Sequence, residues 1–398
     1  MEVSKYQSGF RAGTGTREGI FNLRTICERA LEVNRDVFTC FVDYSKAFDC
    51  VKYDELVKML VDIGIEGRDI KVIAGLYWKQ SGVVRTEYGL SKEFSIKRGV
   101  RQGCVLSPSL FNLYVERIFR AVGDVRGFIV GGHNINNLRY ADDTVLLAEN
   151  ESDLQVLLSS VNEEGRKYGM KVNIDKTKVM VISRTDPFPE INIFLNGSKL
   201  QQVSTMVYLG HLISSNGKCE KEITRRIEIA RGAFESMRNV LTSRNININT
   251  RRKLTQCYIW STLLYGAETW TLSKAMIKKI ASFEMWTYRR ILKITWRDRV
   301  SNQEVLRRMR TKRSLIISVK KRKLDYFGHL IRKDGLQREL LEGKIDGRRG
   351  RGRPRLSWMG NIKEWTSTRY GQCVRRAQGR SRWRSMVANL LRAEDTDR

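Results

Sequence analysis

The sequence predicts an α+β fold in which a split βαβ antiparallel sheet carries helices on one face. A short apolar run, DVFTCFVD (36–43), is typical of a buried strand that ends in an acid. The stretch NNLRYADDTVLLAEN (136–150) has a strand–turn–strand pattern, with two adjacent aspartates in the turn. Amphipathic helical patterns lie between and after these segments. A helical region and then a basic C-terminal region are expected to follow the sheet.

Helical spacing of apolar residues predicts the helices that cover the sheet, at 53–64, 106–123 and 151–165. Their expected N-cap residues are Asp54, Ser107 and Ser152. Short apolar runs predict two short strands within 169–183, on either side of Asp175 and Lys176, and a further strand pair within 206–214. After about residue 216 the apolar spacing is helical throughout, so the chain is expected to continue as a bundle of helices.

The charge distribution points to a polyanionic partner. The 398-residue chain has a formal net charge of +30, and residues 301–398 hold 27 Lys and Arg against 10 Asp and Glu. No long uncharged apolar run or lipidation signal is present, so no membrane partner is expected. The seven cysteines are scattered without a CxxC pair, which indicates a reducing intracellular compartment, nucleus or cytoplasm, and no zinc knuckle.

Three aspartates are the candidate metal ligands. Asp43 ends the first apolar strand, and Asp142 and Asp143 occupy the turn of the predicted hairpin. If the two strands are neighbours, the three carboxylates converge, and such hard oxygen donors suit Mg²⁺, with Mn²⁺ as a substitute. Two such ions about 4 Å apart support phosphoryl transfer. An ordinary exposed turn and a metallonuclease are alternative interpretations of the same residues.

Five segments resemble, in order and approximate spacing, the palm of non-LTR (LINE-type) retrotransposon reverse transcriptases. They are FVDYSKAFDCV, RGVRQGCVLSPSLFNLYVERIF, LRYADDTVLL, GMKVNIDKTKVM and YLGHLIS. The resemblance implies an RNA-directed DNA polymerase that transfers a nucleotide from a dNTP to a primer 3′-hydroxyl, with two Mg²⁺ ions, an RNA template and a DNA primer. Other parts of the same element's polyprotein are candidate partners. The family's fingers blocks would precede Met1, so an N-terminally truncated copy is expected.

The resemblance also implies domains and residue roles. The expected domains are a remnant of the fingers and palm entry (1–35), the palm (36–215), a helical thumb-like region (216–300) and a basic nucleic-acid-binding region (301–398). The catalytic residues implied are the metal-binding Asp43, Asp142 and Asp143 and the proton donor Lys176. The implied substrate-binding residues are Phe48, which would select deoxynucleotides, and Arg101, Gln102, Gly103 and Tyr140. The hairpin that would hold the primer end comprises Tyr208, Leu209 and Gly210.

Several of these assignments have plainer alternatives. Phe48 could be a buried aromatic at a helix start, Lys176 a solvated turn lysine, and residues 208–210 an ordinary strand. In the tail, RGRPR resembles a minor-groove-binding hook, but the motif is short and a basic linker that makes unspecific phosphate contacts is the favoured interpretation. The nucleic-acid-binding arginines expected there are Arg348, Arg349, Arg351, Arg353 and Arg355. For the whole chain, the alternative function is a truncated, non-polymerising nucleic-acid-binding remnant.

Overall fold

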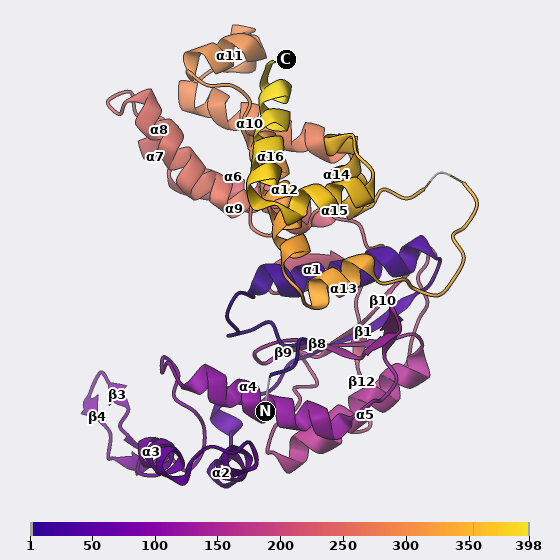
Figure 1. The fold of residues 1–398 in the computed structure, drawn as a ribbon. Coiled ribbons are helices and arrows are strands. Elements are labelled where there is room, and N and C mark those ends of the chain that lie inside the picture. Colours follow the sequence, from indigo (N-terminus) through magenta and orange to yellow (C-terminus); the bar gives the residue numbers. More distant parts are fainter. Residues whose placement is uncertain (1–2, 353, 397–398) are drawn as a thin grey trace. The chain divides into compact units, whose positions relative to one another are not determined.

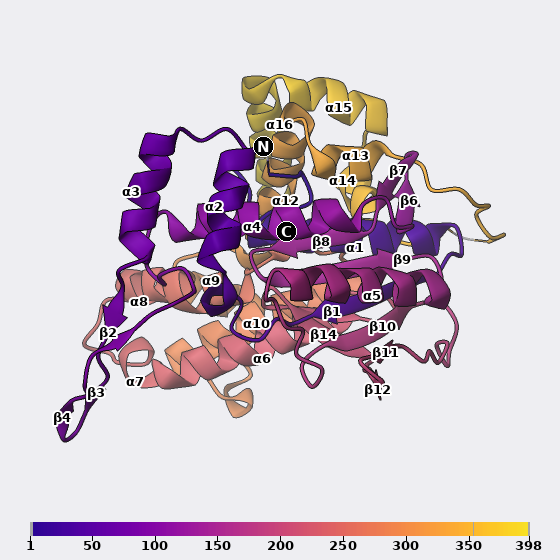
Figure 2. The same cartoon turned by 90° about the horizontal axis from the view of Figure 1, so that it is seen from below.

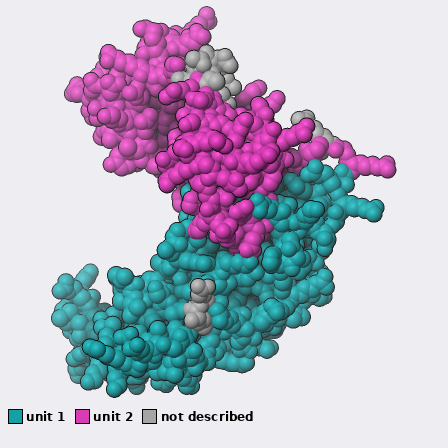
Figure 3. Space-filling model, in the orientation of Figure 1, with its two compact units in different colours: residues 1–209, 342–350 teal, residues 210–341, 351–398 magenta. Residues whose placement is uncertain are grey.

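The computed structural model of the chain describes residues 3–352 and 354–396. The chain divides into two compact units (Figure 3). Unit 1 comprises Met1–Leu209 with Glu342–Gly350, and unit 2 comprises Gly210–Leu341 with Arg351–Arg398. Arg353, one of the predicted nucleic-acid-binding residues, lies outside the described residues.

A five-stranded sheet forms the centre of unit 1. Its spatial order is β13-β10-β1-β9-β8, and all neighbours are antiparallel except β10 and β13. The strands are β1 (Val37–Val42), β8 (Asn137–Tyr140), β9 (Asp143–Ala148), β10 (Lys178–Ile182) and β13 (Gln201–Gln202). Val42 pairs with Thr144, so the end of β1 lies beside the start of β9. The sequence prediction that the acid-bearing strands are neighbours is therefore confirmed.

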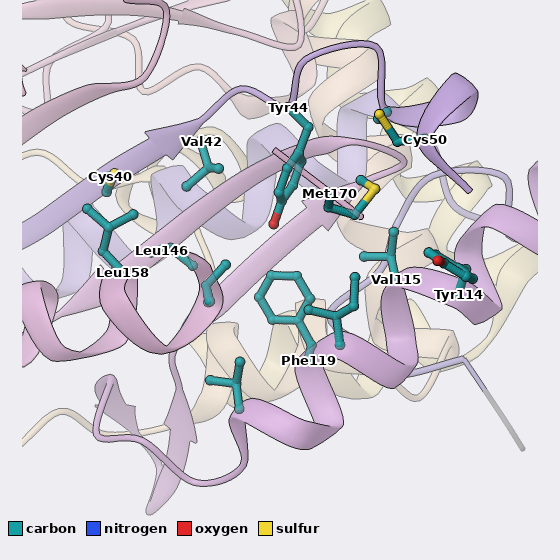
Figure 4. Packing of buried hydrophobic residues seen from close by; sticks show 14 of the residues in the cluster. Cys40, Val42, Tyr44, Cys50, Tyr114, Val115, Phe119, Leu146, Leu158 and Met170 are labelled. Atoms are coloured by element: carbon teal, nitrogen blue, oxygen red, sulfur yellow. The ribbon is translucent and has the colours of Figure 1, made fainter. Parts of the chain in front are cut away.

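Helices cover both faces of this sheet, so the prediction of helices on one face only is wrong. Figures 1 and 2 show α4 (Ser107–Val122) and α5 (Glu151–Lys167) on one face and α1 (Thr16–Glu32) on the other. Alternate side chains of the strands face α4 and α5, so Cys40, Val42 and Leu146 pack with Val115 and Leu158 of these helices (Figure 4). Both faces of the sheet are buried, which explains the continuous apolar run of β1.

Shorter elements complete unit 1. The helices are the 3₁₀ turn Ala47–Cys50, α2 (Tyr53–Asp62) and α3 (Gly67–Tyr77). Four small hairpins pair β2 (Ser81–Gly82) with β5 (Phe94–Ser95), β3 (Arg85–Thr86) with β4 (Gly89–Leu90), β6 (Phe128–Val130) with β7 (His133–Ile135), and β11 (Phe194–Leu195) with β12 (Ser198–Lys199). The last strand of the unit is β14 (Thr205–Tyr208).

Unit 2 is helical apart from its first strand, β15 (His211–Ser214). Its helices are α6 (Glu220–Ser236), α7 (Arg238–Leu241), α8 (Ile248–Leu254), α9 (Ser261–Leu263), α10 (Lys274–Leu292), α11 (Asn302–Arg308), α12 (Leu315–Arg332), α13 (Leu336–Glu342), α14 (Trp358–Thr366), α15 (Tyr370–Gln378) and α16 (Arg380–Thr396). A π-helical segment, Thr255–Trp260, joins α8 to α9.

The core of unit 2 draws on both the predicted helical region and the basic C-terminal region. Leu315 and Val319 of α12 belong to the same buried cluster as Ile223 of α6 and Tyr288 of α10. The indole Nε1 of buried Trp383 donates a hydrogen bond to the Leu324 carbonyl at 2.8 Å. Such burial gives Trp383 a packing role in the core of unit 2, and its ring is not available for stacking on a base.

The predicted helix starts are wrong in detail. The N-cap of α2 is Lys52, not Asp54, and it makes no side-chain cap. Ser107 is the first residue of α4, and its hydroxyl instead lies 3.0 Å from that of Tyr77. Asn150 caps α5, since its Oδ1 accepts a hydrogen bond from Asp153 N–H at 2.8 Å. Helices in this unit are held by packing of their apolar faces, so α2 and α4 form without a side-chain cap and, of these three, only α5 has one.

The first of the two strands predicted within 169–183 is also absent. That segment makes a single bridge, from Val172 to Tyr44, and the regular strand begins only at Lys178. All seven cysteines are described, and none is in a disulfide bond. Among the described residues, no helix has both the length and the apolar character needed to cross a bilayer.

Candidate active site

The end of β1 places Asp43 at the edge of the sheet. Its backbone N–H donates to the hydroxyl of buried Thr177 at 3.2 Å, and its carbonyl accepts from Asn173 N–H at 2.8 Å. The loop 173–177 is therefore fixed against the strand end through both backbone groups of Asp43. Lys176 lies in this loop, and its own N–H donates to Asn173 Oδ1 at 3.2 Å.

The hairpin between β8 and β9 turns through two residues, Ala141 and Asp142, because Tyr140 pairs directly with Asp143. Ala141 has a φ of 55°, in the left-handed region that a residue with a Cβ adopts only when its surroundings enforce it. The enforcing group is the side chain of Gln7. Its Oε1 accepts from Ala141 N–H at 3.0 Å, and its Nε2 donates to Ala141 O at 3.4 Å.

Gly9 allows this close approach. A Cβ at residue 9 would lie 2.4 Å from the Ala141 nitrogen, so only glycine fits. The Gly9 N–H also donates to Gln7 Oε1 at 2.8 Å, and its carbonyl accepts from Asn112 Nδ2 at 2.8 Å. The roles of Gln7 and Gly9 are not predicted by the sequence. The segment QSGF carries no periodic signal, and only the structure shows that it lies against the turn.

A buried ion pair supports the same hairpin from the other side. Arg139 Nη2 contacts Glu116 Oε2 at 2.8 Å, and both side chains are almost fully buried. The Arg139 guanidinium also lies 4.5 Å from the centre of the Phe119 ring. Burial lowers the pKa of Arg139, while Glu116 opposes that change. The strand that leads into the turn is thus fixed to helix α4.

A cavity of about 420 Å³ gathers several of the predicted residues. Five of them line it, namely Asp43, Asp143, Lys176, Tyr208 and Leu209. The cavity is bordered by the ends of β1, β9 and β14 and by the loop that carries Lys176. Buried Tyr208 packs its ring 6.0 Å from that of Phe41, and its hydroxyl has no hydrogen-bond partner. The structure therefore brings the implied metal, proton-donor and primer-end residues of unit 1 to one place.

The carboxylates of the site are electrostatically coupled. Loss of hydration raises the pKa of Asp143 to about 6, and the negative charges of Asp142 and Asp43 add to the increase. The pKa of Asp142 is raised by loss of hydration and by Asp43, against the effect of backbone N–H groups. Burial and then Asp143 raise the pKa of the Tyr208 hydroxyl. The site therefore concentrates negative charge that a cation would stabilise.

The carboxylates do not form a finished three-ligand cluster. Within residues 3–352 and 354–396, no three His, Cys, Asp or Glu side chains are arranged so that they could hold a metal ion. Asp142 is coupled to Asp43, but it is not among the residues that line the cavity. The donor chemistry nevertheless fits Mg²⁺, because carboxylate oxygens are its preferred protein ligands.

The other predicted residues lie outside this cavity. Half-buried Phe48 stacks on Phe111 with ring centres 4.2 Å apart, which agrees with the packing interpretation of this residue. Arg101, Gln102 and Gly103 form an exposed loop, and Gly103 has a φ of 82°. Half-buried Tyr140 contacts the ring of Phe10 at 6.5 Å.

Gly210, the remaining residue of the predicted primer-end hairpin, is the first residue of unit 2.

The described tail arginines are exposed or half-buried in their units. Arg348 and Arg351 are exposed, and Arg349 lies 3.4 Å from Glu32 in unit 1. Arg355 donates to the Asn216 carbonyl at 2.7 Å in unit 2. Arg348, Arg349 and Arg351 thus present charge at the surface.

An α+β sheet with aspartates at adjoining strand ends is the arrangement of a nucleotidyltransferase site. The chain belongs to the reverse transcriptase (RNA-dependent DNA polymerase) family, whose sequence profile matches residues 1–213, more than half of the chain. The resemblance inferred from the five motifs is confirmed by this match.

Relatives among known proteins agree with this assignment. The chain is 30% identical over 253 residues to an uncharacterized transposon-derived protein of Caenorhabditis elegans, covering 60% of this chain and 88% of that one. It is 27% identical to the Pol polyprotein of the retrotransposable element R2 of Popillia japonica, covering 56% of this chain and 33% of the polyprotein. It is 24% identical to the RNA-directed DNA polymerase of the mobile element jockey of Drosophila funebris, covering 76% of this chain and 33% of that protein.

The chain thus spans about a third of the length of these R2 and jockey relatives. Among solved structures, apo telomerase from Candida tropicalis matches with a TM-score of 0.42 at 14% identity, over 80% of this chain and 51% of that one. This score is too low to support an argument about function.

Proposed function

We propose that this chain is the RNA-directed DNA polymerase of a non-LTR retrotransposon, which transfers a nucleotide from a dNTP to a primer 3′-hydroxyl. One observation carries the proposal. Asp43 and Asp143, at the ends of paired strands, share a cavity with Lys176 and Tyr208. In this proposal unit 1 contains the palm, the helices of unit 2 form a thumb-like region, and the partners are an RNA template and a DNA primer.

The proposed metal ligands are Asp43, Asp142 and Asp143. Bound Mg²⁺ or Mn²⁺ would supply charge neutralisation at the reacting phosphate. The strand ends and the Gln7 contact to the turn hold the backbone on which these three carboxylates stand. The raised pKa of Asp143 supports this assignment, because a carboxylate with an unfavourable charge gains most from a bound cation.

Lys176 is the proposed proton donor to the departing pyrophosphate. Its side chain is exposed at the cavity, and its backbone is held by Asn173. An ammonium group in this position neutralises developing negative charge and can act as a general acid. Tyr208, Leu209 and Gly210 are proposed to hold the primer end, and Leu209 has a positive φ of 48° that fixes the direction of the turn.

The remaining proposed roles concern the incoming nucleotide. Phe48 would exclude a ribose 2′-hydroxyl with the part of its ring that is not covered by Phe111. The exposed loop 101–103 and Tyr140 would contact the base pair that forms. Gly103 supports this role, because no atom lies within 4 Å of a Cβ built there and a ligand could approach the backbone.

The experiment is primer extension on an RNA template with dNTPs and Mg²⁺. The wild-type chain should extend the primer, and the double variant Asp142→Ala, Asp143→Ala should not. Asp124→Asn is the matched control, since this aspartate is exposed and lies outside the cavity. Extension that persists in the double variant would refute the assignment of the carboxylates.

The alternative function is a nucleic-acid-binding remnant that does not polymerise. The observation that favours it is the lack of a finished three-ligand cluster among the described residues. This alternative predicts that the wild-type chain binds the primer–template but adds no nucleotide with either Mg²⁺ or Mn²⁺. Extension that depends on Asp142 and Asp143 would exclude it.

A further inference from the structure

A second cavity, of about 650 Å³, lies in unit 2 between α7, the C-terminal end of α10 and the turn that follows it. Four cationic side chains line it, namely Arg238, Arg289, Arg290 and Lys293. No acidic side chain is among its described lining residues, and Glu235 beside the cavity pairs with Arg238 at 3.4 Å and with Arg290 at 3.6 Å, which leaves an excess of positive charge. A concave surface of one charge sign focuses the electrostatic potential and attracts an oppositely charged ligand. The cavity is therefore suited to an anion.

An exposed tryptophan stands at the edge of this cavity. The side chain of Trp296 is 84% exposed, although it lies in an ordered 3₁₀ turn, Trp296–Asp298. Asp298 fixes the turn by accepting from Thr295 N–H at 2.6 Å and from the Thr295 hydroxyl at 2.8 Å. The Arg297 guanidinium lies over the Trp296 ring, 5.6 Å from its centre, and the exposed indole offers a flat surface on which a ligand can stack.

A second aromatic ring strengthens the cationic wall. Half-buried Trp286 lies between two guanidinium groups, at 5.3 Å from Arg231 and 5.2 Å from Arg290, measured to the ring centre. Arg289 Nη2 donates to the Val300 carbonyl at 3.1 Å. These contacts restrain the arginines before any ligand arrives, which lowers the entropy lost on binding.

We propose that this cavity binds a short segment of single-stranded nucleic acid. One unpaired base stacks on Trp296, and the adjoining phosphates contact Arg238, Arg290 and Lys293. Aromatic rings interleaved with cationic groups are the general means by which proteins hold single strands, because every base has a face that can stack. A base inside a duplex is already stacked and cannot use Trp296. The site does not depend on the polymerase chemistry of unit 1.

The test measures binding of the full chain to a labelled oligonucleotide of about eight uridines, by fluorescence anisotropy at about 150 mM salt, with RNA, DNA and duplex arms. Trp296→Ala should weaken single-strand binding about 5- to 100-fold. Trp296→Phe should retain most of the affinity, since a phenyl ring still stacks. Tyr258→Ala is the matched control, because Tyr258 is 56% exposed in the same unit and does not line the cavity.

The cationic side chains that line the cavity are tested separately. Lys293→Ala should reduce the slope of log affinity against log salt by about 0.7, the value for one phosphate bound on a single strand. Lys278→Ala removes the same charge from α10 at a position outside the cavity and should leave the slope unchanged. Trp296→Ala should lower the affinity without changing the slope.

Three results would overturn the proposal. Trp296→Ala could bind single strands as tightly as the wild type, it could lose no more affinity than Tyr258→Ala, or it could weaken duplex binding equally. A photocrosslink from a 5-bromouracil-substituted strand should map to Trp296, and a map confined to unit 1 would also contradict the site. Equal RNA and DNA affinities are expected, because stacking and phosphate binding do not read the 2′-hydroxyl. The assay contains no dNTP, so a failure of polymerisation leaves this test unaffected.

Discussion

Replacing Gly9 by alanine tests whether the N-terminal segment fixes the carboxylate-bearing turn. A Cβ at residue 9 would lie 2.4 Å from the Ala141 nitrogen and 2.9 Å from the Tyr140 carbonyl carbon. Cβ atoms essentially never approach other atoms closer than 3.0 Å, so the segment and the turn must separate by at least 0.6 Å, and by about 1 Å to reach ordinary van der Waals distance. The atoms in the way belong to the backbone, so no side chain can rotate aside.

This displacement should reach the proposed metal ligands. Asp142 and Asp143 directly follow Ala141, and the hydrogen bond from Ala141 N–H to Gln7 Oε1, now 3.0 Å, would be stretched. A misplacement of about 1 Å costs about 10²-fold in rate when positioning supplies the catalysis. We expect Gly9→Ala to lower the single-turnover extension rate about 100-fold. Its affinity for Mn²⁺, measured by electron paramagnetic resonance titration, should also fall.

The matched control is Gly75→Ala. Gly75 lies in α3, and no atom lies within 4 Å of a Cβ built on it, so both measurements should match the wild type. A Gly9→Ala protein that keeps the wild-type rate and the wild-type Mn²⁺ affinity would refute the reasoning. The metal titration gives a result even if extension by the wild-type chain is slow.

Four further predictions follow from the site and the tail. Glu116→Ala leaves the buried Arg139 guanidinium without its carboxylate partner, so it should lower the free energy of unfolding by about 3–5 kcal/mol in denaturant titrations. The control Glu55→Ala removes a partly exposed ion pair with Lys58 and should lower it by less than about 1 kcal/mol. The Asp143 pKa of about 6 exceeds its unfolded value of about 3.9. The contribution of Asp143 to the thermal stability of the metal-free chain should therefore rise as the pH falls from 7 through 6 toward 4, while the affinity for Mn²⁺ falls. The variant Asp143→Asn should remove both pH dependences. Phe48→Ala should lower discrimination against ribonucleotides at least about tenfold in single-nucleotide incorporation, and unchanged selectivity would assign Phe48 to packing alone. Replacing the tail arginines by glutamine should reduce the slope of log affinity for duplex DNA against log salt by about 0.9 for each phosphate that is no longer bound. An unchanged slope would show that these arginines do not bind phosphates. The positions are Arg348, Arg349, Arg351, Arg353 and Arg355.

The sheet and the position of the acids could be predicted because local patterns determine them. The apolar run before Asp43 and the alternation around Asp142 identified two strands, and their antiparallel pairing placed the strand ends that carry these acids side by side. The domain boundaries at 35, 215 and 300 remain predictions. Deleting residues 301–398 would remove Leu315 and Val319 from the core of unit 2, so substitution of the tail arginines is the cleaner test.

The support of the site could not be predicted, since it depends on interactions between distant parts of the chain. Gln7 and Ala141 are 134 residues apart, and nothing in either segment signals the other. The exposed Trp296 could not be distinguished from a core residue, because its neighbours have ordinary helical spacing. Buried polar side chains such as Gln7 and Arg139 are visible only once the fold has enclosed them.

The central position of β1 constrains how the protein can be made. Its two neighbours in the sheet, β9 and β10, are synthesised about a hundred residues or more later. The Thr39 hydroxyl, for example, donates a hydrogen bond to the carbonyl of Met180, which lies 141 residues further along the chain. Until the ribosome has produced both neighbours, a nascent β1 has two unpaired edges and apolar side chains on both faces. The growing chain therefore needs either shielding of this segment by a chaperone or temporary cover from α1, which leaves the ribosome first. Long-range pairing of this kind also slows folding, so the proposed active site forms only after β9 and β10 have been synthesised.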